Sequence, residues 1–158
     1  MGIDLKIFDN FNREWALLTA GNMDSFNMMT ISWGGLGTLW GLPVATVYVK
    51  PIRYTHEFME KSEYFTVSFF SEAYREDLKI LGSKSGRDGN KLSLTKLTAC
   101  AFGGCVGYKE AEQVLLCKKI YRQDLDLSEI PESAVRTYYL KEAPHTIYIG
   151  QVIDILNS

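Results

Sequence analysis

Short β-rich segments, separated by turns that contain glycine, proline or asparagine, are the feature that most constrains the fold of this chain. Val, Ile, Thr, Tyr and Phe dominate these segments, as is typical of strands. Helix patterns are convincing over two stretches only, residues 51–61 and 71–82. We expect five to seven short strands, the clearest over residues 13–21, 26–33, 43–50, 63–70, 104–122 and 145–156.

The order of these elements indicates the fold class. Parallel βαβ repeats need a helix after nearly every strand, and this chain has too few helices for them. A mainly β domain, with an antiparallel sheet and a few helical inserts, fits better. Periodicity favours a small barrel only weakly over a sandwich. No repeat, linker or low-complexity tract divides the chain, so we expect one domain over residues 1–158.

Glycines mark two expected irregularities among the strands. Four glycines fall within residues 34–43, which predicts a loop around Trp40 rather than a strand. In the last strand, Gly150 interrupts the apolar pattern and predicts a β-bulge.

Helix boundaries are predicted from proline, serine and glycine. Pro51 is suited to the first position of a helix, because its missing N–H would have no partner there anyway. Ser71 is expected to cap the second helix, and Gly82 is expected to lie just past its end. The buried face of that second helix is expected to contain Tyr74, Leu78 and Leu81.

Charge, apolar runs and cysteine content limit the cellular locations and the classes of partner that we expect for this chain. A net charge of −2 with both signs interleaved argues against a general nucleic-acid surface, which needs a basic excess. No apolar run approaches the roughly 18 residues of a membrane span, and the N-terminus lacks a signal-peptide pattern. Three cysteines without a C-x-x-C motif are typical of a reduced protein, so we expect a cytoplasmic location.

Familiar catalytic and metal-binding motifs are missing from the sequence. It contains no phosphate-loop motif, no G-x-G-x-x-G at a strand–helix junction and no G-x-S-x-G elbow. With His56 and His145 far apart in sequence, neither a zinc site nor a hydrolytic triad is indicated. If the chain is an enzyme, a bound cofactor is expected to carry the difficult chemistry.

The start of the first expected helix is rich in groups that bind anions. A helix N-terminus offers free N–H groups to a phosphate, and Arg53 and Thr55 add a planar donor fork and a hydroxyl. The alternative is that Arg53 is a solvated residue paired with Glu57 one turn later. These residues alone leave both interpretations open.

Two further stretches have compositions suited to a ligand. Residues 82–90 combine glycines, serines, Lys84 and Arg87, which fits either an anion-binding turn or an ordinary solvated loop. Residues 27–41 join the polar groups of Asn27 and Thr30 to large apolar and aromatic side chains. That mixture suits a flat heteroaromatic ligand, although such side chains also commonly form a core.

Histidine and cysteine side chains are weaker candidates. His145 opens the last strand, where it is either a strand-end residue or a neutral hydrogen-bonding group for a ligand. Cys117 alternates with Leu116 and Lys118, so we expect it to be a small buried hydrophobe. Cys100 and Cys105 flank a short glycine turn, and their spacing leaves free thiols and a redox pair both open.

Three of these stretches, taken in order, resemble one family. Residues 27–70, 81–92 and 144–156 are similar to the flavin reductase-like, FMN-binding split-barrel proteins, in particular the flavoredoxin branch. The resemblance extends from about Trp15 to Leu156. It implies a mainly β, Greek-key split barrel that forms a homodimer and binds one FMN per subunit near the dimer interface.

The same resemblance implies a set of cofactor-binding residues. It places part of the first long block along the isoalloxazine ring or the ribityl chain, namely Asn27, Met29, Thr30 and Ile31. It places the FMN phosphate among Arg53, Tyr54, Thr55, Ser83, Lys84 and Ser85. It adds His145, Trp33 and Lys50 as residues near the flavin.

The function implied by the resemblance is that of a flavoprotein oxidoreductase. NADH or NADPH would donate a hydride to FMN, and a small molecule or a protein would accept the electrons. No catalytic residue of the chain itself is implied, because hydride transfer to a flavin requires no protein acid or base. The alternative is a flavoredoxin-type electron carrier that holds FMN tightly and exchanges electrons with protein partners.

Overall fold

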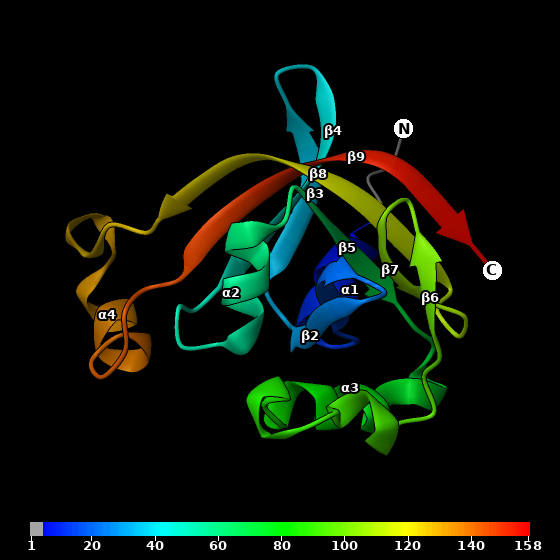
Figure 1. Ribbon diagram of the computed structural model, residues 1–158. Helices are drawn as coiled ribbons and strands as arrows, with labels where there is room; N and C mark the ends of the chain where they lie inside the picture. The colour runs from blue at the N-terminus through cyan, green and yellow to red at the C-terminus, as the bar shows by residue number, and fades with distance from the viewer. Residues whose placement is uncertain (1–4) are drawn as a thin grey trace.

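Antiparallel strands dominate the computed structural model, which describes residues 5–158 (Figure 1). Residues 1–4, which belong to the N-terminal lead and to the expected domain over 1–158, lie outside the described residues. Seven strands of this described part form one sheet in the order β2-β1-β5-β8-β9-β4-β3, with every neighbouring pair antiparallel. In chain order they are β1 (Ala16–Asn22), β2 (Ser25–Ile31), β3 (Gly34–Leu39), β4 (Leu42–Val49), β5 (Tyr64–Phe69), β8 (Gln113–Asp124) and β9 (Thr146–Asn157).

The two edges of this sheet are joined by a very short connection. β2 forms one edge and β3 the other, yet only Ser32 and Trp33 separate them in the chain. Three Cα–Cα steps of about 3.8 Å allow at most about 11 Å between Ile31 and Gly34. The sheet must therefore curl until its edges approach each other, which gives a barrel with a split between β2 and β3.

Side chains alternate between two cores on either side of β1. Leu18 and Ala20 pack inside the barrel with residues such as Val47 and Tyr148. Leu17 points the other way and packs in a second core. This second core lies against α3 (Arg75–Ser83) and a separate hairpin formed by β6 (Ala99–Phe102) and β7 (Cys105–Tyr108).

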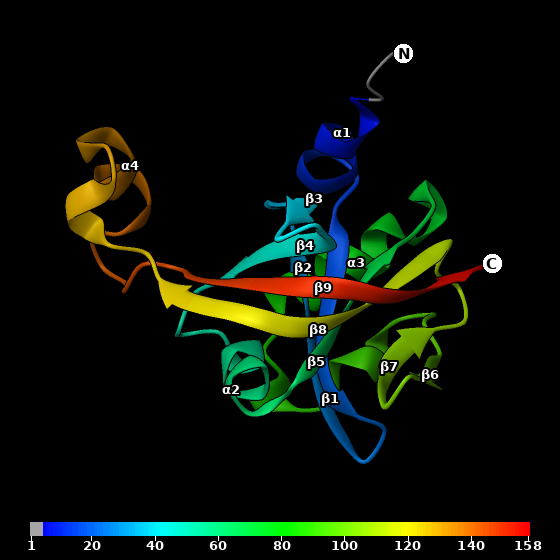
Figure 2. The same cartoon turned by 90° about the horizontal axis from the view of Figure 1, so that it is seen from above.

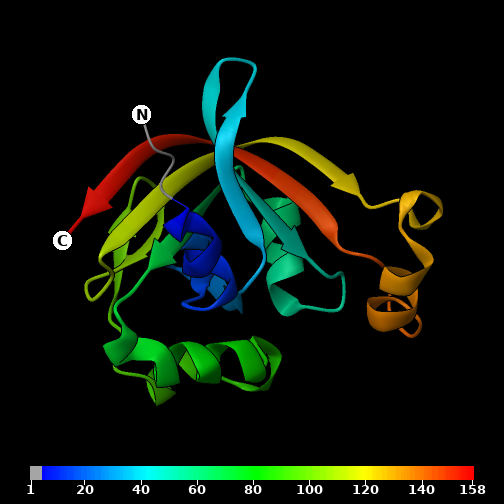
Figure 3. The same ribbon diagram turned by 180° about the vertical axis from the view of Figure 1, so that it is seen from behind.

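The helices cover the barrel from different sides. Figure 3 shows α3 on the side of the barrel away from the β8–β9 ribbon. Tyr74, Leu78 and Leu81 all face the second core, as predicted. No helix within residues 5–158 is both long and apolar enough to cross a membrane. The other helices are α1 (Lys6–Asn12), α2 (Tyr54–Lys61) and α4 (Glu132–Tyr138), with 3-10 turns η1 (Glu72–Tyr74), η2 (Gly86–Asp88), η3 (Lys91–Leu94) and η4 (Leu127–Glu129).

Strands β8 and β9 extend beyond the barrel as a two-stranded ribbon. Figure 2 shows this ribbon with α4 at its far end, away from the rest of the chain. The ribbon is continued by a hydrogen bond of 3.0 Å from the Leu125 N–H to the His145 carbonyl. We call residues 125–145, which join the two strands, the arm. Short elements without clear periodicity, namely α1, α4 and β6, were not expected from the sequence.

The loop predicted over residues 34–43 is wrong, because most of this stretch forms β3 and the start of β4. The two strands are joined by a two-residue turn in which Trp40 and Gly41 have φ values of 53° and 74°. Positive φ at both central positions is the geometry of a type I′ hairpin turn. Glycines are tolerated in β3 because it is an edge strand, and Figure 1 shows the hairpin projecting from the barrel.

Three predicted helix boundaries also need correction. Pro51 lies in a turn closed by the Arg53 N–H and the Lys50 carbonyl at 3.0 Å, and α2 begins only at Tyr54. Proline is favoured at the second position of such a turn. At the second helix, Ser71 precedes a 3-10 turn and makes no side-chain cap.

Gly82 lies inside the last turn of α3 rather than past its end. A Cβ built on Gly82 would stand 3.1 Å from Thr30 Cβ. Glycine at this position therefore permits the close approach of α3 and β2.

A register shift does occur beside Gly150, but the extra residue belongs to the partner strand. Lys119 pairs with Gly150 and Tyr121 pairs with Ile149, so Ile120 of β8 is the unpaired residue. Gly150 has a different role in packing. A Cβ at this position would stand 2.6 Å from Phe65 Cζ and 2.7 Å from the Cβ of Cys117.

The substitution Gly150→Ala should therefore destabilise the fold by about 1–3 kcal/mol, since overpacking forces neighbouring side chains to move. Gly37→Ala is the matched control, because a Cβ on Gly37 of β3 meets nothing within 4 Å. Its effect should stay within about 0.5 kcal/mol. Urea unfolding of both variants measures the difference, and equal midpoints would contradict the packing role of Gly150.

Candidate functional site

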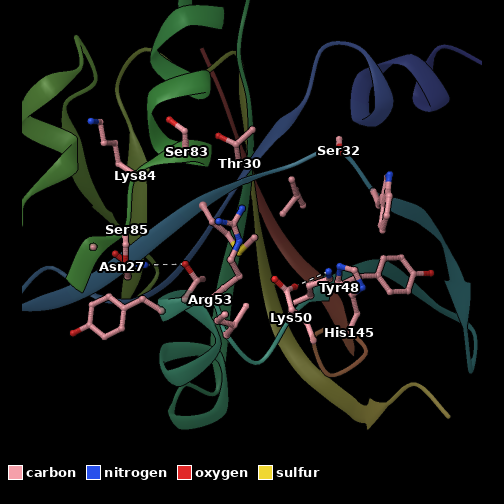
Figure 4. A pocket seen from close by; sticks show the side chains of 18 of the residues that line it. Asn27, Thr30, Ser32, Tyr48, Lys50, Arg53, Ser83, Lys84, Ser85 and His145 are labelled. Atoms are coloured by element: carbon pink, nitrogen blue, oxygen red, sulfur yellow. Dashed lines mark hydrogen bonds and ion pairs between the residues drawn. The ribbon is translucent and has the colours of Figure 1, made fainter. Parts of the chain in front are cut away.

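A pocket of about 530 Å³ opens where β2, the start of α2, the turn after α3 and the arm meet (Figure 4). Its volume lies in the range of about 300–1,000 Å³ that is usual for small-molecule sites. The structure brings all thirteen residues expected at the cofactor site to the lining of this one pocket. They are Asn27, Met29, Thr30, Ile31, Trp33, Lys50, Arg53, Tyr54, Thr55, Ser83, Lys84, Ser85 and His145.

Seven further lining residues were not among those expected at the cofactor site, although Ser32 and Gly86 belong to the two stretches whose compositions suit a ligand. Lys91 lies at the end of the basic, glycine-containing loop, and the composition of that loop was a weak indication that Lys91 belongs to the site. The residues of the arm offered none, because only the tertiary fold brings them back to the barrel. The seven are Ser32, Tyr48, Ile52, Gly86, Lys91, Tyr138 and Glu142.

Asn27 and Thr55 define one end of the pocket. The Asn27 side-chain amide donates a hydrogen bond of 2.8 Å to Thr55 Oγ1, and both residues are buried. Because Thr55 Oγ1 accepts here, its own hydroxyl proton stays available as a donor. Gly86 packs directly against this pair, since a Cβ there would stand 2.1 Å from Asn27 Oδ1. The turn after α3 is thus pressed against the start of α2.

Arg53 connects α2 to α3 rather than pairing along its own helix. Its guanidinium donates to the Gly82 carbonyl at 3.2 Å, in the last turn of α3. The alternative pairing of Arg53 with Glu57 is wrong, because Glu57 forms its ion pair with Arg87 at 2.5 Å. A guanidinium carries five N–H donors, so Arg53 retains donors for a ligand in the pocket.

Lys91 is the third cationic group at this end, with Arg53 and Lys84. It is buried, and its Nζ donates to the carbonyls of Leu81 (2.8 Å) and Lys84 (3.1 Å). Burial, with a smaller contribution from the Arg53 charge, lowers the Lys91 pKa to about 8. Lys91 therefore satisfies helix-end carbonyls of α3 and adds positive charge beside the 83–85 turn.

The loop after α3 is ordered by contacts within itself and with α2. Ser85 Oγ accepts a hydrogen bond of 3.2 Å from the Arg87 backbone N–H. Arg87 itself is not among the lining residues, and it contacts two that are: it donates to the Ile52 carbonyl at 3.1 Å and lies over the Tyr54 ring. The loop is therefore a fixed wall of the pocket rather than a free solvated turn.

Aromatic side chains line the opposite end of the pocket. Trp33 lies edge-on to Tyr138 with ring centroids 5.0 Å apart, and 5.3 Å from the His145 ring. Figure 4 shows His145, Lys50 and Tyr48 together, across the pocket from Ser83 and Lys84. This end is suited to one face or edge of a flat aromatic ligand.

Lys50 holds the arm against the barrel. Its Nζ donates to Glu142 Oε2 at 2.7 Å and to the Tyr138 carbonyl at 2.9 Å. It lies at the end of β4 and also lines the pocket. The ion pair neutralises the charge of Lys50, so the pocket is cationic at the end near α3 and close to neutral at the aromatic end.

His145 is a neutral imidazole at neutral pH. Burial lowers its pKa to about 4, the charges of Lys50 and Arg53 act in the same direction, and Glu142 opposes them. Its Nδ1 lies 2.7 Å from the Tyr139 hydroxyl. His145 therefore faces the pocket as an uncharged hydrogen-bonding group.

The cysteines lie apart from the pocket. Cys117 is fully buried in the barrel core, as predicted. Cys100 and Cys105 are free thiols that are not paired with each other in the β6–β7 hairpin, where Cys100 faces Gly107. Nothing in this part of the structure supports a redox pair. Within residues 5–158, no three His, Cys, Asp or Glu side chains are grouped to hold a metal ion.

The sequence matches the flavin reductase like domain family over residues 8–158. Because this match covers almost the whole chain, the protein belongs to that family. No curated protein sequence matches the chain significantly.

Solved structures with the same fold agree with this assignment. An FMN-binding protein from Thermus thermophilus superposes with a TM-score of 0.74 at 17% identity, covering 100% of this chain and 79% of that one. A flavoredoxin from Methanosarcina acetivorans gives 0.71 at 19% identity, with 100% and 75% covered. The styrene monooxygenase flavin reductase from Pseudomonas putida S12 gives 0.67 at 16% identity, with 91% and 79% covered.

At these identities the structural similarity establishes the fold. The fold class predicted from the sequence, a mainly β, Greek-key split barrel with helical inserts, is therefore confirmed.

The lowered pKa of His145 predicts a pH dependence of stability. The unfolded chain binds a proton on this imidazole below about pH 6.5, whereas the folded chain does so only near pH 4. Stability should therefore fall as the pH drops from 6.5 to 4 and be unaffected by His145 above that window.

The variant His145→Gln should remove this part of the pH slope. Because His56 is present in both proteins, its own titration cancels when their urea unfolding curves are subtracted. Identical slopes for the wild-type protein and the variant between pH 6.5 and 4 would contradict the assignment.

Proposed function

We propose that the protein binds FMN in this pocket and acts as a flavin reductase-like oxidoreductase with NADH or NADPH as donor. The observation that carries the proposal is the pocket's polarity. Arg53, Lys84 and Lys91 gather at one end, and Trp33, Tyr138 and His145 gather at the other. A ligand that joins a phosphate to a flat aromatic ring matches both ends at once.

The cationic end fits a terminal phosphate. Tyr54 and Thr55 begin α2, where backbone N–H groups have no partners within the helix. The Thr55 hydroxyl is free to donate, and the Arg53 fork suits phosphate oxygens. Ser83 and Ser85 add hydroxyl groups on the facing wall.

The aromatic end fits the isoalloxazine ring. Met29 and Ile31 of β2 line the pocket while packing mainly in the barrel core, and Trp33 and Tyr138 provide aromatic surface. Because β2 is an edge of the sheet within residues 5–158, its outer backbone groups have no strand partner there and can contact a polar ring edge. Bound FMN would supply the hydride and electron transfer chemistry.

The chain's own residues would then bind FMN and orient its ring. Lys50 and Glu142 keep the arm beside the ring end of the pocket. His145 offers a neutral hydrogen bond to the ring without adding charge. No residue is required to act as an acid or base.

The second candidate is an electron carrier that exchanges electrons with protein partners instead of NAD(P)H. This candidate is supported by the fold that the chain shares with a flavoredoxin from Methanosarcina acetivorans. In both cases we propose a cytoplasmic protein, a setting that fits its three free thiols, with no nucleic-acid or membrane partner.

We also propose that the protein works as a homodimer. Apolar side chains are exposed on the projecting β3–β4 hairpin, with Trp40 69% and Leu36 43% accessible. Ile153 and Ile155 of β9 are similarly exposed, at 44% and 48%. Exposed apolar patches of this kind often mark contact surfaces. Sedimentation at a two-chain mass supports the dimer, and a one-chain mass at micromolar concentration overturns it.

Replacing Arg53 tests the phosphate end. Arg53→Ala should weaken FMN binding by about tenfold or more, since hydrogen bonds to charged groups contribute about 1.5–3 kcal/mol. Binding of riboflavin, which lacks the phosphate, should change far less. Flavin fluorescence titration gives both affinities. Lys61→Ala, at the far end of α2, is the control for the loss of a positive charge, and it should leave the affinities for FMN and riboflavin unchanged.

Equal losses of FMN and riboflavin in the Arg53→Ala variant would show that the phosphate lies elsewhere.

Stopped-flow absorbance separates the two candidate functions. A reductase should show rapid bleaching of bound FMN by NADH or NADPH, followed by turnover when an acceptor is added. Bleaching by dithionite or a redox protein alone would instead identify an electron carrier. Absence of FMN binding would overturn both.

A further inference from the structure

Tyr139 contacts His145 without itself lining the pocket. Its hydroxyl lies 2.7 Å from His145 Nδ1, and the two rings meet edge-on with centroids 5.6 Å apart. His145 lines the pocket, whereas Tyr139 is not among the lining residues. The contact therefore occupies Nδ1 and leaves Nε2 as the ring nitrogen available to a ligand in the pocket.

The direction of this hydrogen bond follows from the chemistry of the two groups. A neutral imidazole has one donor nitrogen and one acceptor nitrogen, and a phenol can donate or accept. The phenol is the stronger acid and the bare imidazole nitrogen the stronger acceptor, so the O–H of Tyr139 donates to Nδ1. The proton of the neutral imidazole must then be on Nε2.

The surroundings of His145 keep it neutral and fix its ring. The positive charges of Lys50 and, from the other end of the pocket, Arg53 act on it, and so does the carboxylate of Glu142, which is already paired with Lys50. Trp33 also packs against the ring, at 5.3 Å between centroids. Within the described residues, no hydrogen bond to Nε2 is present.

We propose that Tyr139 is a positioning residue that holds His145 as the Nε2–H tautomer, with this N–H directed at the pocket. If FMN occupies the pocket, as proposed above, His145 then offers a neutral donor to the negative charge that builds on the ring when it is reduced. A preorganised donor of this kind stabilises the reduced form relative to the oxidised form. A neutral donor also keeps its proton across the physiological pH range, whereas a group with a pKa within that range would lose its proton there.

Nuclear magnetic resonance of the ligand-free protein tests the tautomer directly. The ¹⁵N shifts of the two ring nitrogens report which one carries the proton. The chain has only two histidines, so the His56→Gln variant assigns the His145 signals without ambiguity. The wild-type protein should show His145 with its proton on Nε2 alone.

Removing the phenol should release the imidazole. In Tyr139→Phe the ¹⁵N shifts should move toward an average of the two tautomers. The His145 pKa should rise by about one pH unit, a tenfold gain in proton affinity, because Nδ1 is no longer occupied by a donor. Tyr138→Phe is the matched control: the neighbouring phenol has no contact with Nδ1, so the tautomer should not change.

The consequence for the flavin is tested by the midpoint potential of the FMN-loaded protein. Tyr139→Phe should make this potential more negative, equivalent to a roughly three- to tenfold loss of preference for reduced flavin. His145→Gln keeps a side-chain N–H donor that does not depend on Tyr139. Adding Tyr139→Phe to His145→Gln should therefore cause no further change.

The outcomes separate this proposal from the proposed function. A proton on Nδ1 of wild-type His145, or an unchanged tautomer and pKa in Tyr139→Phe, would overturn the positioning role whether or not FMN binds. The expected tautomer with an unchanged flavin potential would overturn the role toward the ring. Failure to bind FMN would overturn the proposed function and leave the assignment of the His145 tautomer standing.

Discussion

The two-residue connection between β2 and β3 is the constraint on which the rest of the structure depends. Because Ser32 and Trp33 join opposite edges of a seven-stranded sheet within residues 5–158, the sheet has to close on itself. Closure leaves β2 as a free edge at the split and brings the end of β4 beside it. The pocket forms at this place, with Trp33 in its wall. The connection that shapes the barrel therefore also shapes the site.

Two helix ends of opposite polarity meet at the same place. The start of α2 carries Arg53, which is an unfavourable position for a cation, because helix N-termini are themselves partly positive. The last turn of α3 faces it, and its carbonyls accept from Arg53 at Gly82 and from Lys91 at Leu81. The negative end of one helix thus stabilises cations at the positive end of the other. The two ends together hold positive charge at one end of the pocket.

The sequence predicted which residues gather around one pocket better than it predicted the elements that carry them. Composition near Arg53 and Lys84, together with the family resemblance, indicated groups that the fold does bring to one pocket. The strand β3 was missed, because glycine content says little about an exposed edge strand. Glu142 was missed for another reason. It belongs to the arm, and only the course of the β8–β9 ribbon brings the arm beside the pocket. Such contacts between segments distant in sequence leave no local pattern.

The central claim is that one pocket holds FMN with its phosphate beside α2 and α3 and its ring beside the arm. A crystal structure of the protein grown with FMN tests this most directly. We expect density for the phosphate within hydrogen-bonding distance of Arg53 and Thr55, and for the ring between β2 and His145. A flavin bound elsewhere, or in this pocket with its ends exchanged, would contradict it.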